Sequence, residues 1–428
     1  NDILSYEIYL KKQAIPTKLR GVELKWRRAG MKIALCGIGT VGGGVVKVLA
    51  ENQAQFQAKY KEDLVITHVL TRDPDKVDRL GLESAVFTDR VEDIYEADID
   101  LVVEVMGGVD FAYQVIRQSL SQGRHVVTAN KDLLALHIDE LQALANEKGV
   151  SLLYEASVAG GIPIINGVQV GLAANQISGV MGILNGTTNY MLSHMTQDGW
   201  TYEHALSVAQ EKGYAEADPT NDVGGFDAAR KITLLSRLAY DTRVDFHQVS
   251  VKGIDTVDAS DIAIAAQAGY TMKLLGKSTK TAAGIQVGVE PVLLPNAHPL
   301  SGVSEAFNAV YVEGNAVGQT MFWGPGAGSL ETASAVVSDI LQIADRGFIP
   351  AVLPSQELAI VSQEAPACYY LRFDAPASHV RAVLQTLEIG YLTLAEAPGL
   401  TIKTEAISPA VLAKLEANAT VVARYLMV

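Results

Sequence analysis

The sequence is poor in cysteine, in long apolar runs and in positive charge. Its 428 residues include two cysteines, Cys36 and Cys368, which stand far apart and argue against a disulfide framework or a zinc site. No apolar run reaches the roughly 18 residues of a membrane-spanning helix. Lys and Arg number 34 against 48 Asp and Glu, a formal net charge of −14 that disfavours nucleic acid or an anionic membrane as partner. These absences favour a protein of the reducing cytoplasm.

The length of the chain bounds its organisation. A chain of 428 residues exceeds one ordinary core, so we expect two or three domains. Hydrophobic residues make up 49% and charged residues 19%, as in globular proteins. Residues 1–30 are basic and lack the apolar centre of a signal peptide. Because a strand pattern opens at Met31, we expect residues 1–30 to be a leader or a non-native extension.

The next part of the chain alternates short apolar runs with helical stretches. The runs are KIALC, LVITHVL, LVVEVM, HVVTA and SLLYEA, the last ending at residue 156. Strands that alternate with helices predict βαβ units in a parallel sheet. We therefore expect an α/β domain over residues 31–157.

A glycine-rich stretch, LCGIGTVGGGVV, follows the first of these runs. Within it Gly37, Gly39 and Gly42 form the pattern G-x-G-x-x-G, after a strand and before a helix. In this context the first glycine permits a tight turn, the second lets the backbone approach a pyrophosphate, and the third lets helix and strand pack closely. The free N–H groups of the helix then favour the phosphates. The stretch predicts a dinucleotide-binding Rossmann domain.

The end of the second apolar run bears on the choice of cofactor. The sequence there reads Leu70-Thr71-Arg72-Asp73. An arginine accommodates the 2′-phosphate of NADP, whereas an acidic residue binds the ribose diol of NAD. Because Arg72 comes first, we expect NADP, with NAD possible as well. A solvated turn arginine would give the same pattern.

The pattern changes after residue 157. Helices and then strands over 158–330 predict an α+β layer, which we expect to carry catalysis and dimerisation. The remaining expected segments are a helix returning to the first domain (331–353), a linker (354–365) and a βαββαβ unit of ferredoxin-like order (366–428).

Chemistry-bearing side chains gather in two stretches. TANKDLLA follows a strand and places Lys131 at the carboxyl edge of the sheet, where ligands bind. GYAEADPTNDVGGFDAARKI holds several carboxylates and a lysine, and Asp227 and Lys231 in it share one helix face. A surface lysine, an exposed acidic loop and a solvated ion pair would look identical. No histidine stands in these stretches, which leaves lysine as the available general acid.

Five stretches, in this order and spacing, resemble the homoserine dehydrogenase family. They are TANKDLLA, EASVAGGIPII, GILNGTTNYML, GYAEADPTNDVGGFDAARKI and GPGAGSLETASAV, and the resemblance spans about residues 31–345. It implies NAD(P)H-dependent reduction of L-aspartate 4-semialdehyde to L-homoserine, on the route to threonine, methionine and isoleucine. It also implies a Rossmann domain, a catalytic and dimerisation domain, and a C-terminal module of the ACT type. No aspartate kinase domain precedes the motifs, so we expect the monofunctional form.

The resemblance also implies roles for individual residues. Lys231 would donate the proton, Lys131 would orient substrate and polarise its carbonyl, and Asp227 would hold Lys231. The cofactor would meet two loops and a strand end, at Ile38, Gly39, Thr40, Val41, Thr128, Lys131, Gly326 and Ala327. The substrate's amino group would meet Glu216, with Gly213, Asp222 and Asp227 nearby. A monovalent cation, with sodium expected, would be held mostly by carbonyl oxygens of Glu155, Val158, Gly160 and Ile162.

Two other functions remain open at this point. An acylating semialdehyde dehydrogenase would need a cysteine nucleophile, and neither cysteine lies in the catalytic stretches. A non-enzymatic NADP-binding regulator would not need the acidic stretch with its two placed lysines. We further expect a homodimer or higher homo-oligomer. The loop 374–378 of the tail, Asp-Ala-Pro-Ala-Ser, lacks the glycine usual in ACT modules, so we expect weak or absent inhibition by threonine.

Overall fold

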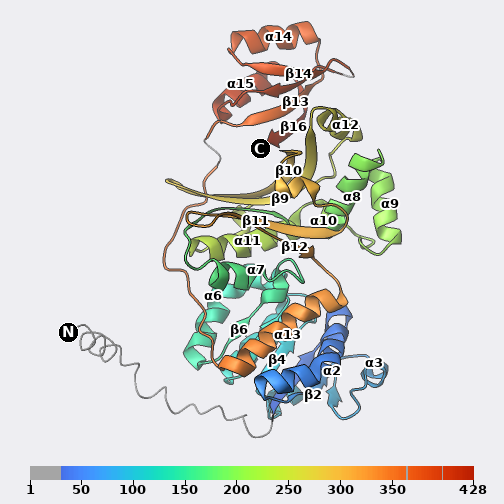
Figure 1. Cartoon of the computed structure of the whole chain (residues 1–428), viewed down its shortest axis with the longest axis vertical. Coiled ribbons are helices and arrows are strands. Elements are labelled where there is room, and N and C mark those ends of the chain that lie inside the picture. The colour runs from blue at the N-terminus through green and yellow to red at the C-terminus, as the bar shows by residue number, and fades with distance from the viewer. Residues whose placement is uncertain (1–29, 363–364, 398) are drawn as a thin grey trace, which may run out of the picture.

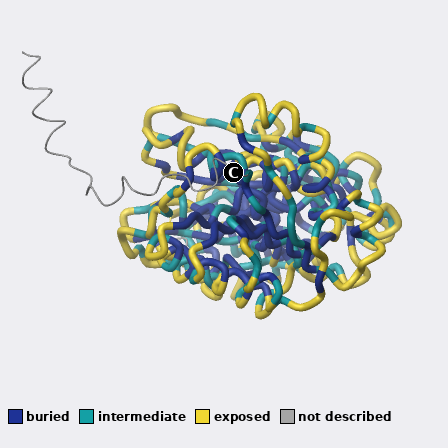
Figure 2. The backbone as a smooth tube through the Cα atoms, turned by 90° about the horizontal axis from the view of Figure 1, so that it is seen from below, coloured by how far each residue is buried: buried dark blue, intermediate teal, exposed yellow. Residues whose placement is uncertain are grey.

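The computed structural model describes residues 30–362, 365–397 and 399–428. The expected leader therefore lies outside the described residues, except for Gly30. Figure 1 shows a lower α/β part, a central mixed sheet and an upper C-terminal unit. None of the described helices is long and apolar enough to cross a membrane. Buried residues run through the interior, and exposed residues gather on the outer loops (Figure 2).

The lower part is a six-stranded sheet in which every pair is parallel. Its spatial order is β3-β2-β1-β4-β5-β6. This order reverses between β1 and β4, and such a switch point is where doubly wound sheets bind dinucleotides. The strands are β1 (Met31–Cys36), β2 (Leu64–Leu70), β3 (Val86–Thr88), β4 (Leu101–Glu104), β5 (His125–Thr128) and β6 (Leu152–Leu153).

Helices cover both faces of the parallel sheet, so its central strands are buried along almost their whole length. Ile33 and Leu35 pack with α2 (Thr40–Tyr60) and α13 (Ser329–Arg346). Ala34 and Cys36 face the core that includes α5 (Asp110–Ser121) and α6 (Lys131–Lys148). Helix α13 thus returns to the first domain, where the Ser329 Oγ donates to the Thr40 carbonyl at 2.7 Å. The short helices α3 (Pro74–Arg79) and α4 (Val91–Glu96), with β3, were not expected from the sequence.

The glycine-rich stretch requires three of its glycines for packing: Gly37, Gly42 and Gly44, where a Cβ would lie 2.3 Å from the Ser329 carbonyl oxygen. Gly37 has a φ of +98°, and a Cβ there would lie 2.8 Å from the Val105 carbonyl oxygen. A Cβ on Gly42 would lie 2.1 Å from the oxygen of Gly37. A Cβ on Gly39, in contrast, would meet nothing within 4 Å, so this position faces open space. The loop therefore has the form that close backbone approach of a ligand needs.

The second sheet is mixed and joins the catalytic layer to the C-terminal unit. Its order is β12-β11-β7-β9-β10-β16-β13-β15-β14, with β8 beside β10. Strand β16 runs parallel to β10 and pairs Leu426 with Val292. The strands are β7 (Ile177–Ile183), β8 (Ser250–Val251), β9 (Tyr270–Thr281), β10 (Gly284–Pro295), β11 (Phe307–Gly314), β12 (Gly318–Pro325), β13 (Cys368–Phe373), β14 (Tyr391–Ala395), β15 (Thr401–Thr404) and β16 (Val421–Met427).

Helices of the catalytic layer carry most of the polar stretches. Helix α11 packs on β7, β9 and β10, and α8 packs on β9 and β11. The first helix of this layer is short: α7 (Ile164–Asn166) is followed by a π-helical turn (Gly167–Gly171). The other helices are α8 (Gly186–Gln197), α9 (Tyr202–Glu211), α10 (Thr220–Val223), α11 (Phe226–Tyr240) and α12 (Ala259–Gln267).

The C-terminal unit has the expected βαββαβ order, with α14 (Ala377–Thr386) and α15 (Pro409–Asn418) between its strands. The segment before it, expected as a linker, is anchored to the catalytic layer over its described part. Ile285 donates its N–H to the Ala359 carbonyl and accepts from the Val361 N–H, both at 2.9 Å. Leu358 donates to the Thr242 hydroxyl at 2.9 Å. The described part of this segment is therefore fixed against the catalytic layer up to residue 361.

Candidate active site

A cleft of about 740 Å³ lies between the carboxyl edge of the parallel sheet and the helices of the catalytic layer. The start of α2 and the start of α6 form one side of it, and α8, α10 and α11 form the other. The predicted site residues that line it are Thr40, Val41, Lys131, Gly160, Gly213, Glu216, Asp222, Asp227, Lys231, Gly326 and Ala327. Residues from five separate sequence stretches thus meet in one place.

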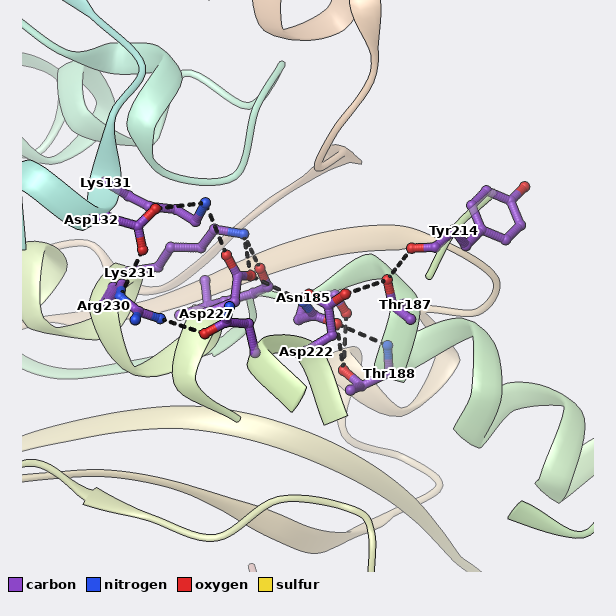
Figure 3. Close-up of polar contacts among 12 residues, drawn as sticks. Lys131, Asp132, Asn185, Thr187, Thr188, Tyr214, Asp222, Asp227, Arg230 and Lys231 are labelled. Carbon is purple, nitrogen blue, oxygen red and sulfur yellow. Dashed lines mark hydrogen bonds and ion pairs between the residues drawn. The ribbon is translucent and has the colours of Figure 1, made fainter. Parts of the chain in front are cut away.

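The centre of the cleft is a carboxylate between two lysines (Figure 3). The Lys231 Nζ donates to the Asp227 Oδ2 at 2.7 Å and to the Leu184 carbonyl at 2.7 Å. The Lys131 Nζ lies 3.4 Å from the Asp227 Oδ1. Lys231 and Asp227 are one turn apart on α11, whereas Lys131 opens α6 of the other domain. The ion pair therefore spans the two domains.

The electrostatics of this centre follow from burial and opposite charge. Burial by itself would raise the pKa of Asp227, but the ammonium groups of Lys231 and Lys131 outweigh it and lower the pKa to about 2. Burial by itself would lower the pKa of Lys131, but the carboxylates of Asp227 and Asp132 outweigh it and raise the pKa overall. Asp227 is therefore ionised and Lys131 protonated at neutral pH.

Asn185, which was not predicted for the site from the sequence, connects the acidic residues. The Asn185 Nδ2 donates to the Asp222 Oδ1 at 2.7 Å and to the Asp227 Oδ2 at 3.0 Å. Its Oδ1 caps α8 by accepting the Thr188 N–H at 2.9 Å. Burial is the main cause of the raised pKa of Asp222. An asparagine three residues before a helical threonine is an N-cap signal, so the sequence could have indicated its position but not its partners.

A second unselected pair supports the lysine of α6. The Arg230 Nε lies 2.7 Å from the Asp132 Oδ1, and the Asp132 Oδ2 lies 3.6 Å from the Lys131 Nζ. Arg230 and Asp132 both line the cleft. Since they join α11 to α6, they hold the two lysine-bearing helices together.

Several predicted cofactor residues do not present side chains to the cleft. Ile38 is 3% exposed and packs in the core of the parallel sheet. Thr128 is fully buried, and its hydroxyl donates to the Glu104 Oε2 at 2.7 Å. Arg72 is exposed just after β2 and is not among the residues that line the cleft. Asp73 beside it is engaged, because its Oδ1 accepts the Lys76 N–H at 3.2 Å.

The residues expected around a cation lie in a buried loop before α7. Glu155 is 2% exposed, and its carboxylate accepts the N–H groups of Ile165 and Asn166, each at 2.8 Å. Its own N–H donates to the Asp339 Oδ2 at 2.8 Å. Burial raises the pKa of both carboxyl groups, and neither has an ion-pair partner among the described residues. The described part of the chain contains no cluster of three or more Asp, Glu, His or Cys that could hold a metal ion.

Comparison with known proteins agrees with the motifs. The family model for homoserine dehydrogenase matches residues 163–341, and that for the homoserine dehydrogenase NAD binding domain matches residues 37–155. The homoserine dehydrogenase of Bacillus subtilis (strain 168) is 46% identical over 314 residues, 73% of this chain and 72% of that protein. The chain belongs to the homoserine dehydrogenase family. It is thus an oxidoreductase with the NAD-binding domain of that family.

Other homoserine dehydrogenases agree with this assignment. The protein of Corynebacterium glutamicum is 42% identical over 317 residues, 72% of this chain and 71% of that protein. The crystal structure of a homoserine dehydrogenase from Thiobacillus denitrificans has a TM-score of 0.85 and 36% identity, covering 93% of this chain and 98% of that one. A hyperthermophilic archaeal homoserine dehydrogenase in complex with NADPH has a TM-score of 0.64 and 26% identity, covering 76% and 99%.

Family membership removes the two other functions considered from the sequence. An acylating dehydrogenase needs a thiolate nucleophile, but Cys36 is fully buried at the end of β1 and burial raises the pKa of its thiol. Cys368 is half-buried in β13, and neither cysteine lines the cleft. A regulator without catalytic activity does not fit a homoserine dehydrogenase. The resemblance drawn from the motifs is confirmed.

Proposed function

We propose that this cleft reduces L-aspartate 4-semialdehyde to L-homoserine, with NADPH preferred and NADH accepted. The observation that carries the proposal is the pair of lysines that converge on Asp227, Lys231 at 2.7 Å and Lys131 at 3.4 Å. They lie beside the carboxyl edge of a dinucleotide-type sheet. The cofactor fits the loop because Gly39 faces open space and the start of α2 lines the cleft.

The chain's own residues account for the protonation step. When bound, the nicotinamide cofactor supplies the hydride to the aldehyde carbon. Negative charge then grows on the carbonyl oxygen, and a positioned ammonium group lowers the barrier. Lys231 gives its proton to that oxygen to complete the hydroxyl and regains a proton from solvent. Asp227 keeps Lys231 oriented until transfer, and Lys131 polarises the carbonyl.

Acidic groups would bind the cationic end of the substrate. Glu216 and Asp222 both line the cleft, and Gly213 lies between them and α9 with a φ of +75°. Carboxylates favour an ammonium group, so this side suits the substrate's α-amino group. The aldehyde end would then extend toward the two lysines.

One assay tests the activity and the cofactor preference together. Purified protein is given L-aspartate 4-semialdehyde, and oxidation of NADPH and of NADH is followed by absorbance. The reverse reaction is followed with L-homoserine and each oxidised cofactor. We expect turnover with both cofactors and a higher kcat/KM with NADPH. Failure to turn over either substrate would contradict the proposal.

A monovalent cation, sodium first, is proposed to bind at carbonyl oxygens of Glu155, Val158, Gly160 and Ile162. The fit rests on two buried carboxylates, Glu155 and Asp339, without a compensating cation among the described residues. Carbonyl oxygens are ligands that hard cations prefer. Thermal stability and activity in sodium, potassium and tetramethylammonium salts test this site, and indifference to all three would count against it.

The assembly proposed is a homodimer or higher homo-oligomer. Strand β12 is an edge strand, and Trp323 and Met321 on it are 56% and 41% exposed. Trp323 stacks on Phe307 with ring centres 4.9 Å apart. A second copy would cover this apolar face and the free edge of the sheet. Light scattering at the assay concentration measures the mass, and a monomer would defeat the proposal.

The C-terminal unit is proposed to be a module of the ACT type with little response to threonine. Its strand order, β16-β13-β15-β14, and its two helices support the type. Its first strand–helix loop ends at Pro376, the residue before α14, which has no backbone N–H to offer a carboxylate. Activity against added L-threonine measures the response, and half-inhibition at micromolar threonine would contradict this part.

A further inference from the structure

A buried carboxylate at the end of β4 belongs to no role described so far. Glu104 is fully buried, and β4 lies between β1 and β5 in the sheet. Its Oε1 accepts the Met106 N–H at 2.8 Å, and its Oε2 accepts the Thr128 hydroxyl at 2.7 Å. It has no ion-pair partner among the residues that the structure describes. A buried carboxylate satisfied only by neutral donors costs stability, so its position calls for an explanation.

The contact with Thr128 continues to the helix that carries Lys131. The Thr128 Oγ1 accepts the Asn130 N–H at 3.0 Å. The Asn130 Oδ1 caps α6 by accepting the Leu133 N–H at 3.2 Å, and its Nδ2 donates to the Gly108 carbonyl at 2.6 Å. Lys131 is the next residue and the first of α6. Three hydrogen-bonded groups therefore connect Glu104 to the first turn of the helix.

The same groups join two loops beside the cleft. Glu104 holds the start of the loop 105–109 through the Met106 N–H, and Asn130 holds its end through Gly108. Gly107 and Gly108 both have positive φ, at +77° and +73°, so this loop relies on its anchors for its shape. The loop after β5 is fixed by the same set of bonds. Neither Glu104 nor Thr128 lines the cleft itself.

We propose that Glu104 is a positioning residue, which fixes Lys131 toward Asp227 by holding the Thr128 hydroxyl and, through it, the start of α6. The proposal rests on the role given to Lys131 in the proposed function. A carboxylate suits this place because both of its oxygens accept hydrogen bonds. A glutamine can still accept the Met106 N–H with its oxygen, but its NH₂ would then face the Thr128 hydroxyl, which would have to turn its hydrogen away and accept instead of donating.

The variants that test the proposal alter the hydrogen bond between Glu104 and Thr128, and Thr128→Val also removes the acceptor of the Asn130 N–H. Glu104→Gln keeps the size of the side chain, and Thr128→Val removes the hydroxyl at nearly constant volume. Thr128→Ser restores the hydroxyl and should recover most of the kcat lost in Thr128→Val. Ser119→Ala, which removes a buried hydroxyl bonded to Val115 on α5, is the control for a loss of buried hydrogen bonding alone. Circular dichroism and thermal melting establish that each variant is folded.

Two readouts are needed, one of turnover and one independent of it. We expect Glu104→Gln and Thr128→Val to lower kcat by about 10- to 100-fold, as small misplacements of catalytic groups do. The double variant should lose no more than the worse single variant, because both act through one bond. Acetylation of lysines, mapped by mass spectrometry, should modify Lys131 several-fold faster in Glu104→Gln, relative to the exposed Lys47 in the same sample.

The outcomes separate this proposal from the proposed function. Wild-type kcat in folded Glu104→Gln and Thr128→Val would overturn it, as would a lowered kcat with unchanged acetylation of Lys131. If Glu104→Gln does not fold, the Thr128→Val and Thr128→Ser pair decides by the same two readouts. A third outcome is that Lys131 is acetylated faster in the variants, but the wild-type protein does not reduce L-aspartate 4-semialdehyde. This outcome would support the positioning role of Glu104 and overturn only the proposed function.

Discussion

The carboxylate of Asp227 and the ammonium group of Lys231 meet at 2.7 Å on one face of α11, and each side chain is 11% exposed. Lys131, from the other domain, approaches the second oxygen of the same carboxylate. A buried charge whose partner is removed is strongly destabilising, so the three groups depend on one another. In the proposed function, the two lysine side chains lie where a carbonyl oxygen would gain charge.

The first prediction concerns the proton donor. Loss of a general acid typically costs about 10²- to 10⁴-fold in rate. We therefore expect Lys231→Ala to lower kcat by at least about 10²-fold while NADPH still binds, as measured by quenching of protein fluorescence. Thermal melting establishes the folded fraction, because Lys231 also bonds to the Leu184 carbonyl. Wild-type kcat with only a raised KM would show that Lys231 binds substrate and does not donate.

The second prediction concerns acid stability. The pKa of Asp227 falls from 3.8 to about 2 in the folded protein. The folded carboxylate holds its proton less tightly than the unfolded one, so its contribution is full above pH 3.8 and disappears as the pH falls through 2. It amounts to about 2 kcal/mol. Urea unfolding of wild type and Asp227→Asn at pH 5, 4 and 3 should show that the difference between their free energies of unfolding shrinks as the pH falls. A constant difference would contradict the prediction.

The sequence predicted the parallel sheet well, because the sheet depends on local patterns, whereas most of the residues predicted for the cleft came from the family resemblance. The G-x-G-x-x-G stretch, the alternation of strands and helices, and the i, i+4 spacing of Asp227 and Lys231 each lie within one segment. The meeting of Lys131 with Asp227 came from the family resemblance. Spacing alone does not reveal that two residues 96 positions apart form an ion pair.

The features that were missed depend on contacts between distant segments. Asn185 bonds to two aspartates, and its motif shows only that it caps a helix. The pairing of β16 with β10 makes one sheet of the catalytic layer and the C-terminal unit, yet the tail reads as a complete βαββαβ unit by itself. Thr128 was expected at the cofactor, but the sequence does not reveal that its hydroxyl donates a hydrogen bond to the buried carboxylate of Glu104.

The third prediction concerns the cofactor. Arg72 is exposed after β2, while Asp73 caps α3 and is less free to bind a ribose diol. A hydrogen bond to a charged group contributes about 1.5–3 kcal/mol. Arg72→Ala should therefore shift the ratio of kcat/KM for NADPH over NADH toward NADH by about 10- to 100-fold. Arg117→Ala, which removes an exposed arginine on α5, is the matched control. An unmoved ratio in Arg72→Ala would refute the assignment.

The fourth prediction concerns a lysine buried behind the cleft. The Lys273 Nζ donates to the Asn189 Oδ1 at 3.0 Å and to the Val303 carbonyl at 2.5 Å, and burial lowers its pKa from 10.5 to about 8. Between those pH values the unfolded chain binds more protons than the folded one, so the stability from this group rises with pH. The free energy of unfolding of wild type, relative to that of Lys273→Met, should rise by up to about 3 kcal/mol from pH 7.5 to 10.5. Denaturant unfolding measures it, and a difference independent of pH would contradict it.

The last prediction concerns the junction with the C-terminal unit. Asp261 on α12 is fully buried and accepts the Tyr370 hydroxyl at 2.6 Å and the Arg372 Nε at 2.6 Å, both from β13. Burial raises the pKa of Tyr370, and the neighbouring carboxylate of Asp261 raises it further. The catalytic layer and the C-terminal unit also share a sheet through β10 and β16. We therefore expect both to unfold in one thermal transition in the wild-type protein.

Removal of the carboxylate should separate these two unfolding events. Asp261→Ala leaves Arg372 without its buried partner, which costs about 3–5 kcal/mol. Differential scanning calorimetry should then show an earlier transition, and limited trypsin digestion should cut the C-terminal unit faster than in wild type. An Asp261→Leu/Arg372→Met double variant should recover part of the loss, because apolar side chains of similar volume can replace a buried ion pair. A single, unshifted transition in Asp261→Ala would show that the shared sheet alone holds the units together.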